Sequence, residues 1–379
     1  MNRSPSWHER QRTIFLLASG VSTAGSFAGL TAKGWILMSG TDNAMLLALH
    51  FAALSLPTLI VSGPAGVRTD RIGCEQVLIQ AQWALLGAGL LAALSIPLLV
   101  GTAQVAVLLA STLLMGIASA YELTARNKYC ALLVDDPRTL APYLTSFSVV
   151  FNVGKLVGPP IGGWLVALTG PATALSLDAL TYLLPIASVI WLLKPNRSME
   201  QLSSSSSSAT LNSAWRECGP VLRHVLKFTG LICVVGFFHP GLAPLIAADT
   251  LGPSPQDLGL FTSVLAAGSI TGGIILQRNS HKFSSRPGLT LGCFALITAV
   301  AQLGMASSTW IPIVLLMVWL IGAGTAGLLS SANLITQVGS KQVIRGRMAG
   351  LSQIAFLGGG GISGLIAAQL TNTLGLQAT

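Results

Sequence analysis

The sequence predicts an all-α membrane protein of about eleven transmembrane helices in two bundles. Of its 379 residues, 52% are hydrophobic and only 9% are charged. Apolar stretches of about 20 residues, the length that crosses a bilayer as a helix, recur along the chain. Basic residues lie almost entirely in alternate connections between these stretches. A soluble domain carries about 25% charged residues, so this chain cannot cover a water-facing surface.

The apolar stretches fall into a set of six and a set of five. The first six lie at 14–38, 44–66, 76–100, 104–125, 141–168 and 172–193. The other five lie at 228–248, 258–277, 287–307, 310–337 and 348–371. The first stretch exceeds the ~7–15-residue core of a signal peptide, so we expect it to be retained.

A polar segment separates an N-terminal six-helix bundle at 1–193 from a C-terminal five-helix bundle at 228–379. The segment, 194–227, contains the run Ser203–Ser208 and has the composition of a flexible cytoplasmic linker. A twelfth span would need about 20 more residues beyond 371. The sequence therefore predicts that a twelfth helix is missing and that the C-terminus lies on the outer face.

The basic residues predict the orientation in the membrane. Only Lys33 and Lys155 of the 21 lysines and arginines fall inside apolar stretches. The others occupy the N-terminal tail, the linker and the even-numbered connections, which the positive-inside rule places in the cytoplasm. We therefore expect a multi-pass protein of the bacterial inner membrane with a cytoplasmic N-terminus. The net charge of +9 follows this topology and forms no patch, so no nucleic-acid partner is expected.

A glycine-rich connection is expected at 63–73, after the second stretch. Its motif residues are Gly66, Asp70, Arg71 and Gly73. The Asp70 carboxylate can accept hydrogen bonds from a neighbouring helix N-terminus, and it would form a latch that breaks and reforms as helices move. The alternative is a solvated turn whose charges only set the topology.

The fifth stretch combines small residues, proline and a lysine. Its motif residues are Gly154, Lys155, Gly158, Pro159, Gly162 and Gly163. Small residues four apart let helix backbones approach closely, and proline bends a helix. The alternative is a kinked packing helix without a role in transport direction.

Both motifs resemble signatures of the major facilitator superfamily. Segment 66–73 is similar to its helix 2–3 signature, although Cys74 and Glu75 stand where that family usually has basic residues. Segment 154–163 is similar to the antiporter signature of exporting facilitators. Residues 126, 178–182 and 345–347 further resemble the enterobactin-exporter-like, or transmembrane secretion effector, branch. The resemblance implies two helical bundles around a central cavity and alternating access.

Ionisable residues inside membrane helices are costly and usually functional. The candidates are Lys33, Glu122, Arg126, Lys155 and Asp178. We expect Glu122 to pair with Arg126 one turn later, and Lys155 to pair with Asp178. Lys33 either is functional or snorkels to the outer face.

The first helix differs from the resembling branch at one position. The branch often has an acidic residue there, whereas this chain has Gly25-Ser26. A serine cannot carry a proton at neutral pH, which argues against proton coupling through the first helix.

No sequence motif indicates an enzyme, a metal site or a cofactor. Phosphate-binding loops, nucleophile elbows and zinc-binding helices do not occur, and the five cysteines lack ligand spacing. The resemblance implies a monomeric secondary transporter in the lipid bilayer. It would export a small organic or amphipathic solute, such as a siderophore or drug, by proton antiport. The alternative is a degenerate facilitator that does not transport and acts as a partner subunit or sensor.

Overall fold

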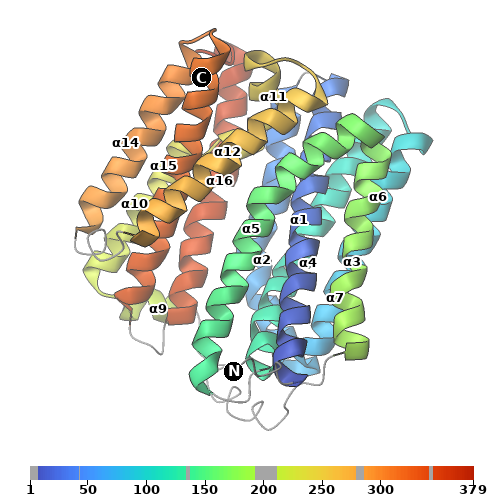
Figure 1. The fold of residues 1–379 in the computed structure, drawn as a ribbon, viewed down its shortest axis with the longest axis vertical. Helices are drawn as coiled ribbons and strands as arrows, with labels where there is room; N and C mark the ends of the chain where they lie inside the picture. The colour runs from blue at the N-terminus through green and yellow to red at the C-terminus, as the bar shows by residue number, and fades with distance from the viewer. Residues whose placement is uncertain (1–6, 42, 134–136, 193–210, 279–285, 341–344) are drawn as a thin grey trace, which may run out of the picture. The chain divides into compact units, whose positions relative to one another are not determined.

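The computed structural model describes residues 7–41, 43–133, 137–192, 211–278, 286–340 and 345–379. Almost all of these residues are helical, and no strand occurs among them (Figure 1). Within the described ranges, 11 helical segments are long and apolar enough to cross a membrane, which confirms the predicted count.

The helices of the N-terminal half follow one another with very short turns. They are α1 (Trp7–Thr41), α2 (Ala44–Ile72), α3 (Cys74–Leu98), α4 (Gly101–Leu132), α5 (Pro137–Thr169), α6 (Pro171–Thr181), α7 (Leu183–Ala187) and the π-helical turn η1 (Ser188–Leu192). The last three form a single membrane-length segment, Pro171–Trp191.

The C-terminal half contains seven further described helices. They are α9 (Leu211–Glu217), α10 (Pro220–Gly236), α11 (His239–Thr250), α12 (Pro255–Arg278), α14 (Pro287–Ala306), α15 (Ile311–Val338) and α16 (Arg345–Leu374). Helices α10 and α11 together form one membrane-length segment, Pro220–Thr250. The first helix of this segment starts at Pro220, earlier than the expected 228, and residues 193–210 of the expected linker lie outside the described residues.

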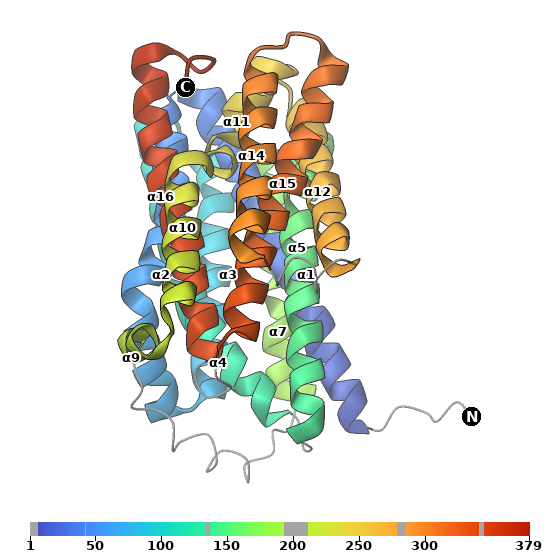
Figure 2. The same ribbon diagram turned by 90° about the vertical axis from the view of Figure 1, so that its left-hand side faces the viewer.

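By its contacts the chain divides into two compact units. The first unit contains Met1–Lys33 and Pro57–Ser208, and the second contains Gly34–Leu56 and Ala209–Thr379. The end of α1 and the start of α2 thus belong to the second unit, in which Phe51 packs against Gly241 of α11. Also within the second unit, α12 and α14 pack on α15, and α10 packs on α16 (Figure 2).

The connection predicted at 63–73 is almost entirely helical, so that prediction was wrong. Helix α2 continues through Pro64 to Ile72, and the chain reverses at Gly73 alone, whose φ of 91° is a conformation that glycine adopts without strain. Glycine and proline indicate loops in soluble proteins, but helices of membrane proteins tolerate both. Asp70 and Arg71 therefore lie in the last turn of α2.

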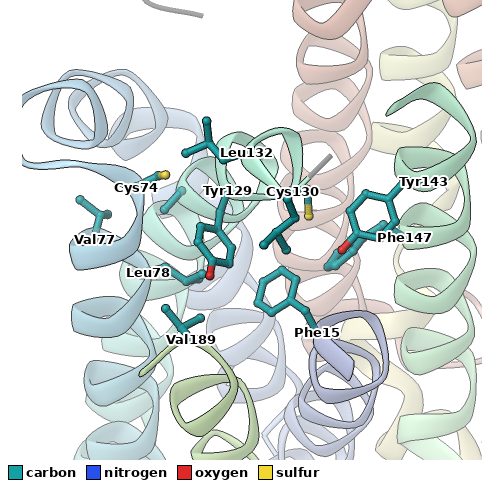
Figure 3. Close-up of a cluster of buried hydrophobic side chains, with 12 residues drawn as sticks. Phe15, Cys74, Val77, Leu78, Tyr129, Cys130, Leu132, Tyr143, Phe147 and Val189 are labelled. Carbon is teal, nitrogen blue, oxygen red and sulfur yellow. The ribbon is translucent and has the colours of Figure 1, made fainter. Parts of the chain in front are cut away.

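An apolar cluster lies within the first unit, where α1, α3, α4, α5 and η1 meet (Figure 3). The Phe15 ring lies 5.2 Å from the Tyr129 ring and 5.9 Å from the Phe147 ring, measured between centroids. Cys74 belongs to this cluster and is only 1% exposed. A basic side chain at position 74 would have to enter an apolar environment, which explains why a small apolar residue fits here.

Glycines on α5 bring this helix against α1 (Figures 1 and 2). A Cβ atom added at Gly158 would lie 2.5 Å from the Ala24 carbonyl oxygen, and one at Gly154 would lie 2.9 Å from the Gly20 carbonyl oxygen. A Cβ atom at Gly162 would overlap the backbone of Ala28. The glycines at intervals of four therefore allow backbone contact, as their spacing predicts.

Replacing Gly158 with alanine tests this contact. We expect Gly158→Ala to lower the melting temperature of the purified protein, because overpacking at a close contact typically costs about 1–3 kcal/mol. Gly87→Ala is the matched control, since a Cβ atom at Gly87 of α3 meets nothing within 4 Å. That control should leave the melting temperature unchanged or raise it, because alanine favours helix over glycine by about 1 kcal/mol. Equal melting temperatures for the two variants would contradict the contact.

Candidate functional site

Asp70, the acidic residue of the motif at 66–73, links the end of α2 to α4. The Lys128 ammonium of α4 donates a 2.9 Å hydrogen bond to Asp70 Oδ1 at the end of α2. The expectation that a helix N-terminus would donate to this carboxylate was therefore wrong, because the donor is a lysine side chain. Nearby, Arg68 donates a 3.0 Å hydrogen bond to Gln80 of α3. The end of α2 is thus joined to both α3 and α4 by exposed polar contacts.

The predicted pairing of Glu122 with Arg126 is confirmed. Arg126 Nη1 lies 2.7 Å from Glu122 Oε1 and 2.9 Å from Oε2 on the same face of α4. Gln82 of α3 makes a further contact of 3.5 Å with Oε1. Both charged residues are buried, with exposures of 8% for Glu122 and 3% for Arg126. This pair is held by several hydrogen bonds, which lowers the cost of burying its charges.

Aromatic rings of α5 cover the buried guanidinium. The Arg126 guanidinium carbon lies 4.3 Å from the Phe151 ring centroid and 5.0 Å from that of Phe147. The faces of aromatic rings attract cations. These contacts join α4 to α5 at the level of the Glu122–Arg126 pair.

Lys155 lies against aromatic rings and not against Asp178, so the expected pairing was wrong. Its ammonium lies 4.6 Å from the Phe151 centroid and 5.9 Å from the Phe27 centroid. The charge that acts on it is the like charge of Arg126. Position along a helix predicts the depth of a residue, but it does not determine which neighbouring helix the residue faces.

Asp178 of α6 faces α1, and Lys33 is the cation that acts on it. Asp178 is 2% exposed and Lys33 is fully buried, so Lys33 does not snorkel to the surface. A Cβ atom at Gly29, one turn before Lys33, would overlap the Asp178 carboxylate. Among the described residues, neither Asp178 carboxylate oxygen makes a close hydrogen bond and the Lys33 ammonium makes none, although the Tyr182 hydroxyl also acts on the Asp178 carboxylate. The two opposite charges are both buried and act on each other, but they do not lie within ion-pair distance.

A second polar contact lies beside this pair. The hydroxyls of Ser26 on α1 and Tyr182, which follows α6, are 2.8 Å apart. Ser26 also donates to the Ser22 carbonyl at 2.9 Å. The position at which the resembling branch often has an acid thus contacts the turn that follows Asp178. In this chain the acidic group beside α1 comes from α6.

The contact between α1 and α6 was not predicted, although the sequence contains a signal for it. Gly25 and Gly29 are four residues apart on α1, and Cβ atoms there would overlap Thr181 and Asp178, respectively. Small residues at this spacing indicate a face on which a neighbouring helix packs closely. In the part of the chain that the structure describes, no group of three or more His, Cys, Asp or Glu residues could hold a metal ion.

Comparisons with known proteins agree with this architecture. Residues 4–379 match the family model described as transmembrane secretion effector. The multidrug efflux pump Tap of Mycolicibacterium fortuitum is 24% identical over 387 residues, which cover 97% of this chain and 91% of that protein. The pump Tap of Mycobacterium tuberculosis is also 24% identical, over 394 residues that cover 100% of this chain and 90% of that protein.

Solved structures show the same fold at low sequence identity. A D-xylose-proton symporter superposes with a TM-score of 0.73 at 13% identity, covering 96% of this chain and 90% of its own. A bacterial homologue of the iron transporter ferroportin superposes with a TM-score of 0.72 at 15% identity, covering 97% of this chain and 95% of its own. With the family match, these similarities show that the chain belongs to the transmembrane secretion effector family of the major facilitator superfamily and is a multi-pass membrane transporter, not an enzyme.

Proposed function

We propose that this chain exports a small organic or amphipathic molecule in exchange for protons, by alternating access. It acts as a monomer in the bacterial inner membrane, with its N-terminus in the cytoplasm. The relatives named multidrug efflux pumps and the glycine-mediated contact of α5 with α1 support the exporter direction. The observation that carries the proposal is the buried Asp178 carboxylate beside Lys33.

An antiporter needs a group that takes up a proton in one conformation and releases it in the other. Glu122 is poorly suited, because Arg126 and Gln82 hold its carboxylate by hydrogen bonds. Within the described residues, Asp178 makes no hydrogen bond to a charged side chain, although the Tyr182 hydroxyl acts on its carboxylate, so its protonation breaks no bond of the Glu122–Arg126 kind. Among the deeply buried acids of the first unit, Asp178 is therefore the better proton carrier.

Protonation of Asp178 would change the charge of the contact between α1 and α6. With Asp178 ionised, the pair with Lys33 is neutral overall, and with Asp178 protonated, the contact carries one positive charge. A charge in a dry contact is costly, so the two protonation states would favour different arrangements of α1 and α6. A ligand or proton shifts a conformational equilibrium only through such a difference between states.

Two sequence features that favoured a non-transporting facilitator, Cys74 and Ser26, are also compatible with a transporter. Cys74, which departs from the family pattern, packs in an apolar cluster. Ser26, which replaces the acid of the first helix, lies beside the helix that supplies Asp178. Both departures have a packing explanation that is compatible with transport.

Asp178→Asn tests the coupling role. We expect this variant to lose at least 10-fold in accumulation driven by a pH gradient, because an amide cannot exchange a proton. Exchange of labelled for unlabelled solute at equal pH should persist. The measurement uses proteoliposomes and a panel of anionic, neutral and cationic amphipathic dyes, followed with whichever dye the unaltered protein transports.

Asp249→Asn is the matched control for this variant, since Asp249 is exposed at the end of α11. It should keep gradient-driven accumulation. Accumulation by Asp178→Asn equal to that of the unaltered protein would exclude Asp178 as the proton carrier.

The ion pair at the end of α2 supplies a test of the latch. Asp70→Asn should impair transport while the amount of protein in the membrane stays normal, because an exposed ion pair contributes only about 0–1 kcal/mol to stability. The exchanged variant, Asp70→Lys with Lys128→Asp, should recover part of the transport rate. Efflux by Asp70→Asn at the rate of the unaltered protein would leave the latch without support.

Cysteine labelling tests the orientation. Cys293→Ser provides the background, because the other four cysteines are buried. In intact cells, a membrane-impermeant maleimide should label Thr309→Cys, between α14 and α15, on the outer face. Ser205→Cys, in the serine run, should be labelled only after the membrane is permeabilised. The reverse pattern would mean that the chain is inverted.

A further inference from the structure

We propose that Lys155 binds the anionic group of the transported solute, with the rings of Phe27 and Phe151 against its apolar body. The solute class is then an organic anion, a carboxylate or sulfonate attached to an aromatic or aliphatic skeleton. This inference rests on the proposed function, since it identifies the solute-binding site of the same transporter.

The charges within the first unit do not balance. Among its described residues, the deeply placed ionisable groups are two acids and three bases: Lys33, Glu122, Arg126, Lys155 and Asp178. Glu122 is engaged by Arg126, and Asp178 is the charge that acts on Lys33. Among the described residues, no carboxylate lies within ion-pair distance of Lys155. One cation in the membrane interior is therefore left without an anion.

The electrostatic surroundings of Lys155 favour a bound anion. From α4, Arg126 acts on it as a like charge, and Glu122 is already occupied by that arginine. From α1 and α5 it meets the rings of Phe27 and Phe151. Phe151 also contacts the Arg126 guanidinium at 4.3 Å, so two cations share this ring. A bound anion would offset their repulsion, whereas a bound cation would increase it.

Lys155 is more accessible than Arg126. Arg126 is 3% exposed, whereas Lys155 is only partly buried on α5, one residue beyond the glycine that packs on α1. A lysine ammonium offers three donors to an approaching oxyanion. Ionisable residues inside membrane helices commonly mark the paths of substrates and ions. The neighbouring rings favour an organic anion with an apolar body over a small inorganic one.

The test is a binding measurement on the full-length protein in neutral detergent without added lipid. Melting temperature is followed with increasing 1-naphthoate, with 1-naphthylmethylammonium as the cation of matched skeleton, and with chloride at equal ionic strength. We expect naphthoate to raise the melting temperature saturably, while the ammonium compound and chloride leave it nearly unchanged. Lys155→Arg should retain the response, because it keeps the charge.

Lys155→Met should weaken the apparent affinity for naphthoate at least 10-fold. The matched control is Lys227→Met, which removes an exposed lysine from α10 of the second unit and should bind naphthoate normally. If Lys155→Met does not fold, the melting temperatures of the unaltered protein with naphthoate, with the ammonium compound and with chloride still test whether the protein binds an organic anion selectively. Equal stabilisation by the ammonium compound or by chloride would overturn the proposal, as would undiminished binding by Lys155→Met.

The binding test is independent of transport. Naphthoate binding that depends on Lys155, in a protein that moves no dye in proteoliposomes, would support the anion site and reject the exporter. Proton-driven export of cationic dyes, without naphthoate binding, would support the exporter and reject the anion site.

Discussion

Close backbone contact at α1 is the constraint on which the arrangement of the first unit depends. Glycines of α5 face the backbone of α1 at Gly20, Ala24 and Ala28, and glycines of α1 itself face α6. Within a bilayer no hydrophobic driving force pulls helices together, so packing at such small residues supplies much of their association. Because α6 approaches α1 this closely, Ser26 of α1 reaches the Tyr182 hydroxyl, and Asp178 lies against Gly29.

The charges within the first unit are held in three different ways. Glu122 and Arg126 are close enough for hydrogen bonds and form a pair that stays satisfied. Asp178 and Lys33 are both buried and act on each other without a hydrogen bond between them. Lys155 lies against aromatic rings and is acted on by a like charge. These three arrangements fit the roles proposed above. Glu122 with Arg126 is a structural pair, Asp178 with Lys33 is the proposed proton-carrying pair, and Lys155 is the proposed binding group for an anionic ligand.

The departures from the family signature after α2 are also explained by packing. Since α2 remains helical to Ile72, Gly73 alone makes the turn, and Cys74 at once enters the cluster formed with Phe15 and Tyr129. The ion pair of Asp70 with Lys128 of α4 then replaces the lost basic residues as the polar connection at this end of the helices.

The sequence alone determined the features that depend on one helix at a time. The membrane-length segments follow from apolar length, and their count is confirmed. The Glu122–Arg126 pair follows from a spacing of one helical turn. The close contact made by α5 follows from its glycines at intervals of four, although its partner α1 was not predicted.

Only the tertiary structure decided which helices face each other. It placed Asp178 against Gly29 of α1, the helix that carries Lys33, and not against Lys155, and it grouped Gly34–Leu56 with the second unit. The physical reason is that helices apolar on all sides carry no periodic signal for their inner face. Their neighbours are selected by steric fit between residues far apart in the chain, and that fit exists only once the bundle has formed.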